Sequence, residues 1–432
     1  MAGEAAALRV ERALEKARGS QDELNAFTSF DEEAVDRATR LDHVGGSGPM
    51  VGVPLAVKDL IDHEGRVTTC GSAFYRHFAT STAPCIRRLL EAGAVVVGRT
   101  NLHEWAFGFS SENPHWGPVR NPWDPRTSSG GSSGGSGAAV GAGMTPIALG
   151  TDTGGSVRVP AALCGTYGLK VTYGAVPLDG VFPLVPSIDT VGPLADSMEG
   201  ITTVYRVLSG DRRQSPTPER ARIGIPQPWF DSAPMADEIA KAFGDAVGAL
   251  RGMGHEVRPI EMPDVAPLIQ IVHAIAPEVR EVHRPFRERE EKYGDDVAAR
   301  LDDAERVTDD EVEAARKWQT MMRHRFADAF ATVDFLLTPT VPVRRKVIGE
   351  ETIGDKHYRS VLSYFTSLVN HALHPALAMP MADSGKPPAS LQLIGRMDSE
   401  PELIGLGEAL ERQGLVAFST AKDGPQTIPG PG

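Results

Sequence analysis

The chain has 432 residues, of which 41% are hydrophobic and 23% are charged, ordinary values for a globular protein. Its formal net charge of −13 argues against a nucleic-acid-binding surface, which needs clustered Lys and Arg. Three cysteines, Cys70, Cys85 and Cys164, cannot build a disulfide framework and lack metal-ligand spacing, so we expect small buried residues in a reducing compartment.

The N-terminal segment does not have the organisation of a targeting sequence. It mixes charges and lacks a basic stretch followed by an apolar one, which argues against a secretory signal. No run of 18 or more apolar residues occurs, so no membrane span is predicted. We therefore expect a cytoplasmic protein that binds neither membrane nor nucleic acid.

Apolar periodicity predicts alternating helices and strands along the chain. The first two helices would be joined around Asn25-Ala26-Phe27, and the first strand would end on Lys58. The predicted helices cover 5–18, 31–42, 84–92, 235–252 and 401–413, and the predicted strands cover 51–57, 94–98, 222–226, 255–260, 335–338, 376–379 and 390–394.

The interval 270–330 differs from the rest of the chain because it is dense in charge and has helical propensity. It is either a set of solvated helices over the core or a variable helical cap over a substrate entrance, and the sequence does not separate the two. Residues 422–432 are rich in Pro and Gly and are predicted to be a flexible tail. The expected organisation is one domain over 1–421.

Two Gly/Ser clusters, Gly130–Gly137 and Thr153–Ser156, flank an almost uncharged apolar segment. The first cluster is predicted to lie outside helices and strands, because Gly costs roughly 0.5–1 kcal/mol in their interior relative to Ala. A run of N–H groups without side chains can surround an anion or a developing oxyanion. These clusters are therefore candidates for a binding or catalytic loop.

Three interpretations of the first cluster compete. A flexible linker is disfavoured by the apolar run and second cluster that follow. A phosphate loop is disfavoured because neither glycine-rich consensus is present and no lysine occurs between Lys58 and Lys170. Gly130–Gly134 formally fits the G-x-S-x-G nucleophile turn of α/β-hydrolases. In that case Ser132 would act with an Asp and one of the later histidines, which include His255, His273, His371 and His374.

The segment GGSSGGS, followed by DTGGSVRVPAALCGTYGLKVTYG, resembles the signature of the amidase signature family of serine hydrolases. The family implies a single α/β domain, with a mixed twisted β-sheet covered by α-helices on both faces. It also implies a small-molecule amide substrate and no metal or organic cofactor, and a homodimer is a reasonable expectation. The resemblance extends to Val53–Asp59, Gly98–Glu104, Ser111–Pro114, Arg120–Asp124 and Asp189–Leu194, with weaker echoes at 337–340 and 391–395.

The resemblance assigns a Ser-cisSer-Lys triad. Ser156 would be the nucleophile that forms an acyl-enzyme, and Ser132, held in a cis peptide, would bridge it to Lys58. A lysine becomes a base only when burial disfavours its charged form, as in Ser–Lys variants of the hydrolase triad. The alternative interpretation gives these residues no catalytic role: Lys58 would be a solvated surface lysine, and Ser132 and Ser156 would be serines in turns.

The resemblance also assigns residues that support the triad. The backbone N–H groups of Thr153, Gly154 and Gly155 would form the oxyanion hole. Asp152 and Arg158 would pair to hold the loop, and Ser133 would hydrogen-bond within the same network.

Two further segments invite a functional interpretation. His103-Glu104 does not fit the H-E-x-x-H metal motif because position 107 is Phe, so a structural role is favoured. The aromatic interval 105–123 is expected either to line an acyl pocket or to pack in the core.

The activity most favoured is hydrolysis of a small carboxamide to carboxylate and ammonia or amine. One alternative is the glutaminase-like A subunit of a tRNA-dependent amidotransferase, which passes ammonia to a partner protein. The loop 180–187 looks more like that of stand-alone amidases. Another alternative is a binding protein that kept the fold and lost the chemistry.

Overall fold

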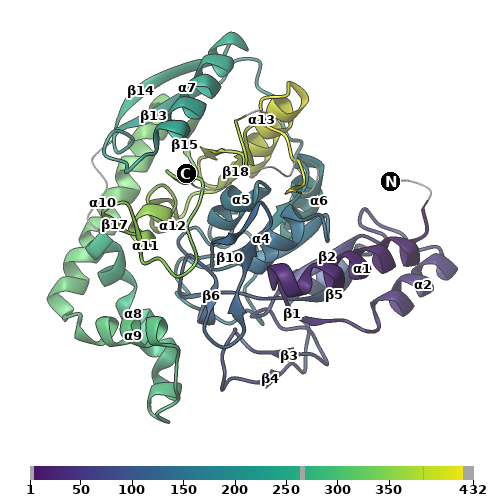
Figure 1. The fold of residues 1–432 in the computed structure, drawn as a ribbon. Coiled ribbons are helices and arrows are strands. Elements are labelled where there is room, and N and C mark those ends of the chain that lie inside the picture. The colour runs from purple at the N-terminus through teal and green to yellow at the C-terminus, as the bar shows by residue number, and fades with distance from the viewer. Residues whose placement is uncertain (1–3, 263–267, 383, 422–432) are drawn as a thin grey trace, which may run out of the picture.

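The apolar segments of the sequence assemble into one mixed sheet in the computed structural model, which describes residues 4–262, 268–382 and 384–421 (Figure 1). Over these residues the sheet has 11 strands. In sheet order they are β1 (Phe27–Phe30), β5 (Val95–Thr100), β2 (Pro54–Lys58), β10 (Ile147–Asp152), β12 (Thr190–Ala195), β11 (Tyr167–Lys170), β18 (Ala376–Pro380), β19 (Ser390–Ile394), β15 (Phe335–Pro339), β13 (Arg222–Pro228) and β14 (Glu256–Met262).

Strand direction explains how the sheet brings distant segments together. β2 lies between β5 and β10 and runs parallel to both, with Leu55 opposite Ile147 and Val57 opposite Leu149. β12 then pairs with β10 in the antiparallel sense. The carboxyl ends of β2 and β10 therefore lie side by side, which places Lys58 next to the segment that enters the second Gly/Ser cluster.

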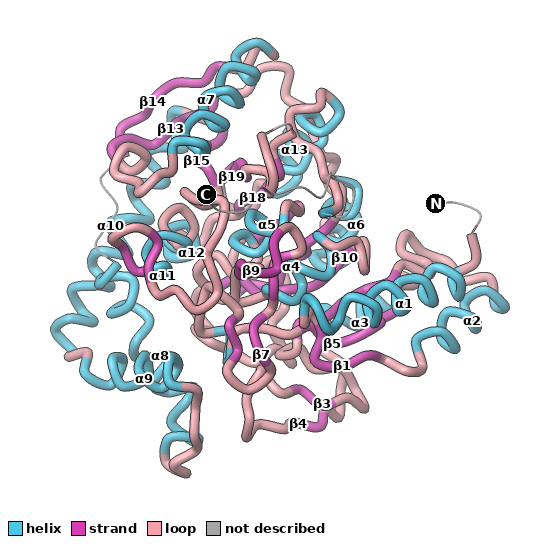
Figure 2. The backbone as a smooth tube through the Cα atoms, viewed as in Figure 1, coloured by secondary structure: helices cyan, strands magenta, loops and turns pink. Residues whose placement is uncertain are grey.

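Helices cover both faces of this sheet (Figure 2). Because side chains alternate along a strand, Leu55 and Val57 enter one hydrophobic core while Ala56 enters another. The first core includes residues of α3 and α6, and the second includes residues of α1 and α4. The helices are α1 (Ala6–Leu24), α2 (Ala34–Val44), α3 (Pro84–Glu91), α4 (Gly134–Gly141), α5 (Arg158–Cys164), α6 (Met198–Ser209), α7 (Asp237–Gly252), α8 (Leu268–Arg287), α9 (Asp295–Arg306), α10 (Asp309–Thr332), α11 (Tyr358–Leu362), α12 (Ser367–His371) and α13 (Glu400–Arg412). This architecture confirms the predicted fold class.

Short elements fill the connections between these helices and strands. They are β3 (Val67–Thr68) with β4 (His77–Phe78), β6 (Glu112–Asn113) with β7 (Gly117–Pro118), β8 (Arg120–Asn121) with β9 (Asp124–Ser128), β16 (Thr352–Ile353) with β17 (Lys356–His357), and the 3₁₀ turn η1 (Glu104–Ala106).

The prediction for the first Gly/Ser cluster was wrong in part, because α4 begins at Gly134 inside it. The reason is packing. A Cβ on Gly135 would lie 2.3 Å from the carbonyl oxygen of Asn101 and 2.4 Å from that of Ala26. Glycine's intrinsic cost in a helix is outweighed here by the close approach of backbone that only glycine permits.

Gly135→Ala is expected to destabilise the protein by about 1–3 kcal/mol or more, because the atoms a Cβ would meet are backbone oxygens that cannot rotate away. Gly244→Ala in α7 is the matched control, since a Cβ there meets nothing within 4 Å. That change should stabilise by about 0.5–1 kcal/mol. Urea unfolding of both variants measures the difference, and equal midpoints would contradict the packing argument.

Two other elements differ from the sequence prediction. Helix α1 continues to Leu24, and strand β1 occupies the segment that was expected only to join two helices. Phe27–Phe30 has four residues, which is too short for a clear alternating pattern, and it is held by pairing with β5 rather than by its own composition. Its position at the sheet edge could not be read from sequence alone.

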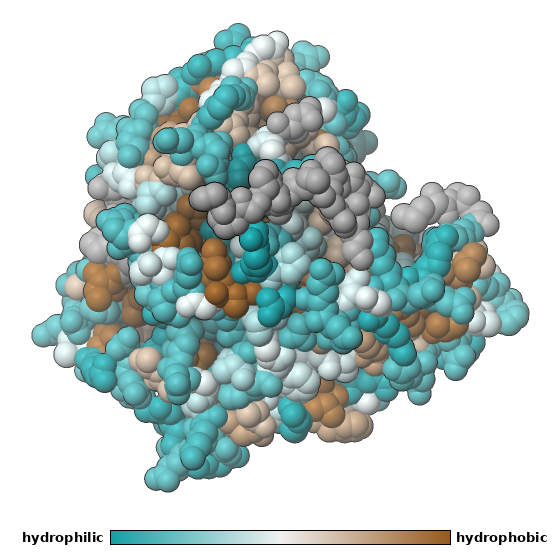
Figure 3. Space-filling model, in the orientation of Figure 1, coloured by the Kyte–Doolittle hydropathy of each residue, from teal (hydrophilic) through white to brown (hydrophobic). Residues whose placement is uncertain are grey.

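The charge-rich interval 270–330 forms α8, α9 and α10, and α8 and α9 lie at the lower left of Figure 1. Residues 422–432, predicted to be a flexible tail, lie outside the described residues. The face drawn in Figure 3 is mostly hydrophilic, with smaller hydrophobic areas between. Among the helices of the described residues, none combines the length and apolar character that a membrane crossing requires.

Candidate active site

Lys58 is the last residue of β2, and its side chain is completely buried. Its Nζ lies 2.8 Å from Ser132 Oγ and 2.8 Å from Thr151 Oγ1. Thr151 belongs to the neighbouring parallel strand β10, so the sheet itself fixes this contact. The alternative interpretation of Lys58 as a solvated surface residue is therefore wrong.

The environment of Lys58 changes its acidity. Burial disfavours the ammonium form and lowers the pKa to about 7, although the carboxylates of Asp152 and Asp189 act in the opposite direction. At neutral pH a large fraction of this amine is uncharged. A neutral lysine side chain within hydrogen-bond distance of a hydroxyl can accept a proton from it.

Ser132 and Ser133 lie in the turn that leads into α4. The peptide bond between Gly131 and Ser132 is cis, and both serine side chains are fully buried. Ser133 Oγ donates to the carbonyl of Thr151 and accepts from its N–H, each at 3.2 Å. The N–H of Ser133 donates to the carbonyl of Ser156 at 3.2 Å. This turn is thus joined both to β10 and to the residue predicted as the nucleophile.

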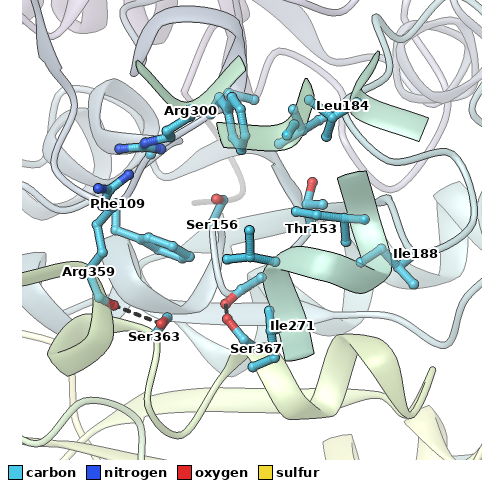
Figure 4. Close-up of a pocket in the computed structure, with 18 of the residues that line it drawn as sticks. Phe109, Thr153, Ser156, Leu184, Ile188, Ile271, Arg300, Arg359, Ser363 and Ser367 are labelled. Atoms are coloured by element: carbon cyan, nitrogen blue, oxygen red, sulfur yellow. Dashed lines mark hydrogen bonds between the residues drawn. The ribbon is translucent and has the colours of Figure 1, made fainter. Parts of the chain in front are cut away.

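Ser156 lines a cavity of about 240 Å³. Its side chain stands near the middle of that cavity, between Phe109 and Thr153 (Figure 4). Thr153 and Gly154 line the same cavity. A reacting carbonyl group placed there would therefore contact a serine hydroxyl and the adjacent backbone together.

The peptide unit between Gly154 and Gly155 is held on both sides. Its carbonyl accepts from Thr366 Oγ1 at 2.7 Å and from Ser367 Oγ at 2.9 Å. Its N–H, which belongs to Gly155, donates to Asp152 Oδ1 at 2.8 Å. The structure thus directs the Gly155 N–H away from the expected oxyanion role, because a carboxylate is the stronger acceptor within reach.

Gly155 remains a position where only glycine fits. Its φ is +129°, and a Cβ would lie 2.2 Å from Thr366 Oγ1. The residue lets the chain turn sharply between β10 and α5, which brings Ser156 into the cavity.

Asp152 and Arg158 form a fully buried ion pair, with 2.9 Å between Asp152 Oδ1 and Arg158 Nη2. Burial alone would raise the pKa of Asp152, but Arg158 and the amide of Asn370 hold it well below its usual range. Arg158 also donates to Asn370 Oδ1 at 2.6 Å and to Gln392 Oε1 at 2.8 Å. The loop that carries Ser156 is therefore joined to α12 and β19.

Asp189 holds the other side of this loop. Its Oδ1 accepts from Thr153 Oγ1 at 2.6 Å, and its Oδ2 accepts from the N–H groups of Leu184 and Val185 at 2.8 and 3.0 Å. Burial raises the pKa of Asp189, which these three donors partly offset. Asp189 thus connects the loop 180–187 to the oxyanion candidate Thr153.

Three of the four histidines considered for an α/β-hydrolase triad make other contacts. His255 Nδ1 accepts from the N–H of Ala221, and His374 Nδ1 lies 2.9 Å from the carbonyl of Gly395. His371 lines the cavity but contacts Gln319, and burial lowers its pKa to about 4. The side-chain partner of Ser132 is Lys58, so this arrangement does not match a Ser-His-Asp triad.

His103 and Glu104 have structural contacts, as favoured from sequence. His103 Nε2 lies 3.0 Å from Asp296 Oδ2, and Glu104 contacts His115 and the N–H of Gly294, each at 2.9 Å. Both residues therefore attach the signature region to the start of α9. Within the described residues, no group of three or more His, Cys, Asp or Glu side chains could hold a metal ion.

Sequence reasoning missed several residues of the cavity and its surroundings. Phe107 and Phe109 line the cavity, as one interpretation of the interval 105–123 allowed, while Trp105 packs in the core. A role for Gln392 near the site could have been suspected because it lies in the segment LQLIG, which weakly resembles the family. No motif contains Asn370. Two arginines, Arg300 and Arg359, also line the cavity, and nothing in the charge-rich sequence around them distinguished them from their neighbours.

Comparison with known proteins gives a consistent picture. A sequence profile of the family described as Amidase matches residues 9–404. The chain is 33% identical to the A subunit of glutamyl-tRNA(Gln) amidotransferase from Nitrosospira multiformis, over 91% of each chain. It is also 33% identical to the protein of the same name in Methanosarcina acetivorans, over 90% of each chain.

Solved structures agree. An amidase crystal structure superimposes with a TM-score of 0.88 at 33% identity, covering 95% of this chain and 96% of that one. A structure of a vestigial protein complex, described as revealing the origins of an s-triazine catabolic enzyme, gives 0.89 at 32% identity over 96% and 97%. The amidotransferase A subunit from Thermotoga maritima gives 0.78 at 27% over 96% and 95%. The chain therefore belongs to the amidase signature family, whose members in this comparison include amidases and amidotransferase subunits.

Proposed function

We propose that this chain is a stand-alone amidase that hydrolyses a small carboxamide through a Ser156 acyl-enzyme. The observation that carries the proposal is the buried Lys58 amine, 2.8 Å from the Ser132 hydroxyl, in a turn that is hydrogen-bonded to Ser156. The cavity of about 240 Å³ at Ser156 has room for a small acyl group, and an adjoining cavity of about 360 Å³ shares Ala106, Thr153 and Leu184 with it.

The proposed reaction needs only the residues already described. Ser156 Oγ attacks the amide carbon, and its proton passes to Ser132, whose own proton passes to neutral Lys58. A neutral amine that donates one N–H to Thr151 can accept the Ser132 proton with its lone pair. The proton then returns along the same path to the departing nitrogen, and ammonia leaves. Water attacks the acyl-enzyme by the same relay and releases the carboxylate.

The developing oxyanion would be bound by the N–H groups of Thr153 and Gly154, which line the cavity. One such donor is worth roughly 2.7–4 kcal/mol of barrier where it has been removed from other enzymes. The two hydroxyls on the Gly154 carbonyl and the Thr153–Asp189 hydrogen bond would keep these groups in position before substrate arrives. Helices α8 and α9, which contribute to the cavity wall, would act as the cap over its entrance.

A second candidate function is the glutaminase-like A subunit of an amidotransferase, favoured by the names of the curated relatives. The stand-alone role is supported by the higher TM-score to an amidase, 0.88, than to the amidotransferase protein of Thermotoga maritima, 0.78. A binding protein without activity is a third candidate, and the presence of Lys58, Ser132 and Ser156 argues against it.

The purified chain alone is expected to release ammonia from some members of a panel of aliphatic, aromatic and amino-acid amides. Ser156→Ala run in parallel gives the blank for contaminating amidases. Release of ammonia from L-glutamine but from no other amide, and only after a partner protein is added, would favour the amidotransferase candidate. No ammonia together with no labelling by a fluorophosphonate probe would favour the inactive binding protein.

A further inference from the structure

Two arginines line the cavity that contains Ser156. Arg300 comes from α9 and Arg359 from α11, so segments far apart in the sequence converge here. Figure 4 shows their guanidinium groups on the same side of the cavity, beside Phe109. Neither residue belongs to the proposed proton relay or oxyanion site.

Positive charge exceeds negative charge at this side of the cavity. Asp296 accepts two hydrogen bonds from Arg300 Nη2, at 3.0 and 2.7 Å, and lies 3.8 Å from Arg359 Nη1. One carboxylate thus faces two permanently charged guanidinium groups. The same carboxylate contacts His103 Nε2, and burial lowers the pKa of that imidazole, which favours its neutral form.

The other ionisable groups that line the cavity do not cancel this excess. Asp303 lies 2.9 Å from Arg306 Nη1, and its side chain is 64% exposed. His357 Nδ1 accepts from the N–H of Arg359, and burial lowers the pKa of His357. Glu351 lies 3.4 Å from His357 Nε2, but its side chain is 73% exposed, so solvent screens its charge. His371 has its pKa lowered to about 4 and is neutral at pH 7.

Arg300 also has an unused donor. The residue is only 8% exposed, and its Nε is buried without a hydrogen-bond partner among the described residues. The ring of Phe107 lies over the guanidinium, with 5.1 Å between Arg300 Cζ and the ring centroid. The carboxylate of Asp296 therefore satisfies only part of the donor capacity of this guanidinium, which keeps its full positive charge at the cavity wall.

We propose that the cavity binds an acyl group ending in a carboxylate, so that the substrate is a monoamide of a short dicarboxylic acid. The inference rests on the proposed function and adds the substrate class. The carboxylate would lie between Arg300 and Arg359 while the amide carbon lies at Ser156. The intervening methylene groups would contact the ring of Phe109, which Figure 4 shows between Ser156 and the two arginines.

The same charge distribution disfavours an amino-acid amide such as glutamine. An α-ammonium group would add a third positive charge near two guanidinium groups. Among the described residues that line the cavity, the carboxylate that could face it is Asp303, which is exposed and already paired.

The test compares substrates matched in shape. Glutaramate is paired with 5-methylhexanamide, in which an isopropyl group replaces the carboxylate, and succinamate is paired with 4-methylpentanamide. We expect kcat/KM to be at least about 10-fold higher for each carboxylate than for its neutral partner. Equal values, or a preference for the neutral amides, would overturn the inference while leaving the proposed amidase function intact.

Variants of the two arginines locate the effect. Arg359→Gln and Arg300→Gln should each lower kcat/KM for glutaramate by about 10- to 100-fold, mainly through KM, with little change for 5-methylhexanamide. Arg220→Gln, which removes an exposed arginine paired with Glu256 where neither residue lines the cavity, is the matched control and should change kcat/KM for neither substrate. Equal losses on both substrates would indicate a structural role and reject the inference. The side chain of Arg359 is more exposed than that of Arg300, so its variant remains informative if Arg300→Gln does not fold.

A binding measurement separates failure of this inference from failure of the proposed function. Calorimetry should detect glutaramate binding to Ser156→Ala, and Arg359→Gln introduced into that variant should weaken it by at least about 10-fold. Binding without turnover by the wild-type chain would reject the amidase and keep the carboxylate site. Turnover of neutral amides without glutaramate binding would reject the site and keep the amidase.

Discussion

Ser156→Ala is expected to lower kcat for amide hydrolysis by at least about 10⁴-fold, because removing the nucleophile from a serine hydrolase removes the covalent path altogether. The residue is 4% exposed and lines the cavity, so the lost hydroxyl leaves a small void and little strain. The folded structure should persist, with an unchanged circular dichroism spectrum. A fluorophosphonate probe should label the wild-type chain and not this variant.

Ser363→Ala is the matched control for this experiment. Ser363 lines the same cavity, but its hydroxyl donates to the carbonyl of Arg359 at 2.7 Å (Figure 4). Its loss should change kcat less than about tenfold, within the range of a single neutral hydrogen bond. If Ser156→Ala kept most of the activity while Ser132→Ala abolished it, Ser132 would be the nucleophile and the proposed relay would be wrong.

Sequence reasoning identified the sheet and its strands well where a strand is both apolar and buried on two sides. β2, β5 and β15 are examples, since continuous apolar runs in them reflect helices packed on both faces. It failed where structure depends on partners rather than on composition. Strand β1 exists because β5 pairs with it, and α4 tolerates its glycines because Asn101 and Ala26 approach its backbone.

The candidate site likewise contains residues that motifs predicted and residues whose position depends on packing partners. Lys58, Ser132 and Asp152 come from motif segments, and the sheet brings these segments together. The direction of the Gly155 N–H depends instead on its hydrogen bond to the Asp152 carboxylate and on the hydroxyls of Thr366 and Ser367, which hold the Gly154 carbonyl. No motif contains Thr366 or Ser367. The two cavity arginines belong to segments whose sequences look like ordinary solvated helix. Their place in the cavity follows only from how α9 and α11 pack.

Lys58→Met is expected to lower kcat/KM for the best amide by at least about 10³-fold, since no other group near Ser132 in the described part of the chain is positioned to accept its proton. Burial lowers the pKa of Lys58 to about 7, and the base acts only when it is uncharged. Below pH 7 the wild-type kcat/KM should therefore fall about tenfold per pH unit, and above pH 7 it should level off. Lys58→Arg, which remains protonated at every accessible pH, should be as inactive as Lys58→Met.

A variant of Lys170 tests whether the fall in kcat/KM below pH 7 is caused by titration of Lys58. It is a second buried lysine whose pKa is lowered to about 7 by burial, with Arg158 adding to the effect. Its Nζ donates to the carbonyls of Val171 and His374, at 3.0 and 2.8 Å, rather than to either serine. Lys170→Met should lower the melting temperature but leave the midpoint of the activity profile near pH 7. If the fall in activity below pH 7 disappeared in Lys170→Met and persisted in Lys58→Met, the titrating base would be Lys170. The proposed relay from Ser156 through Ser132 would then have no proton acceptor.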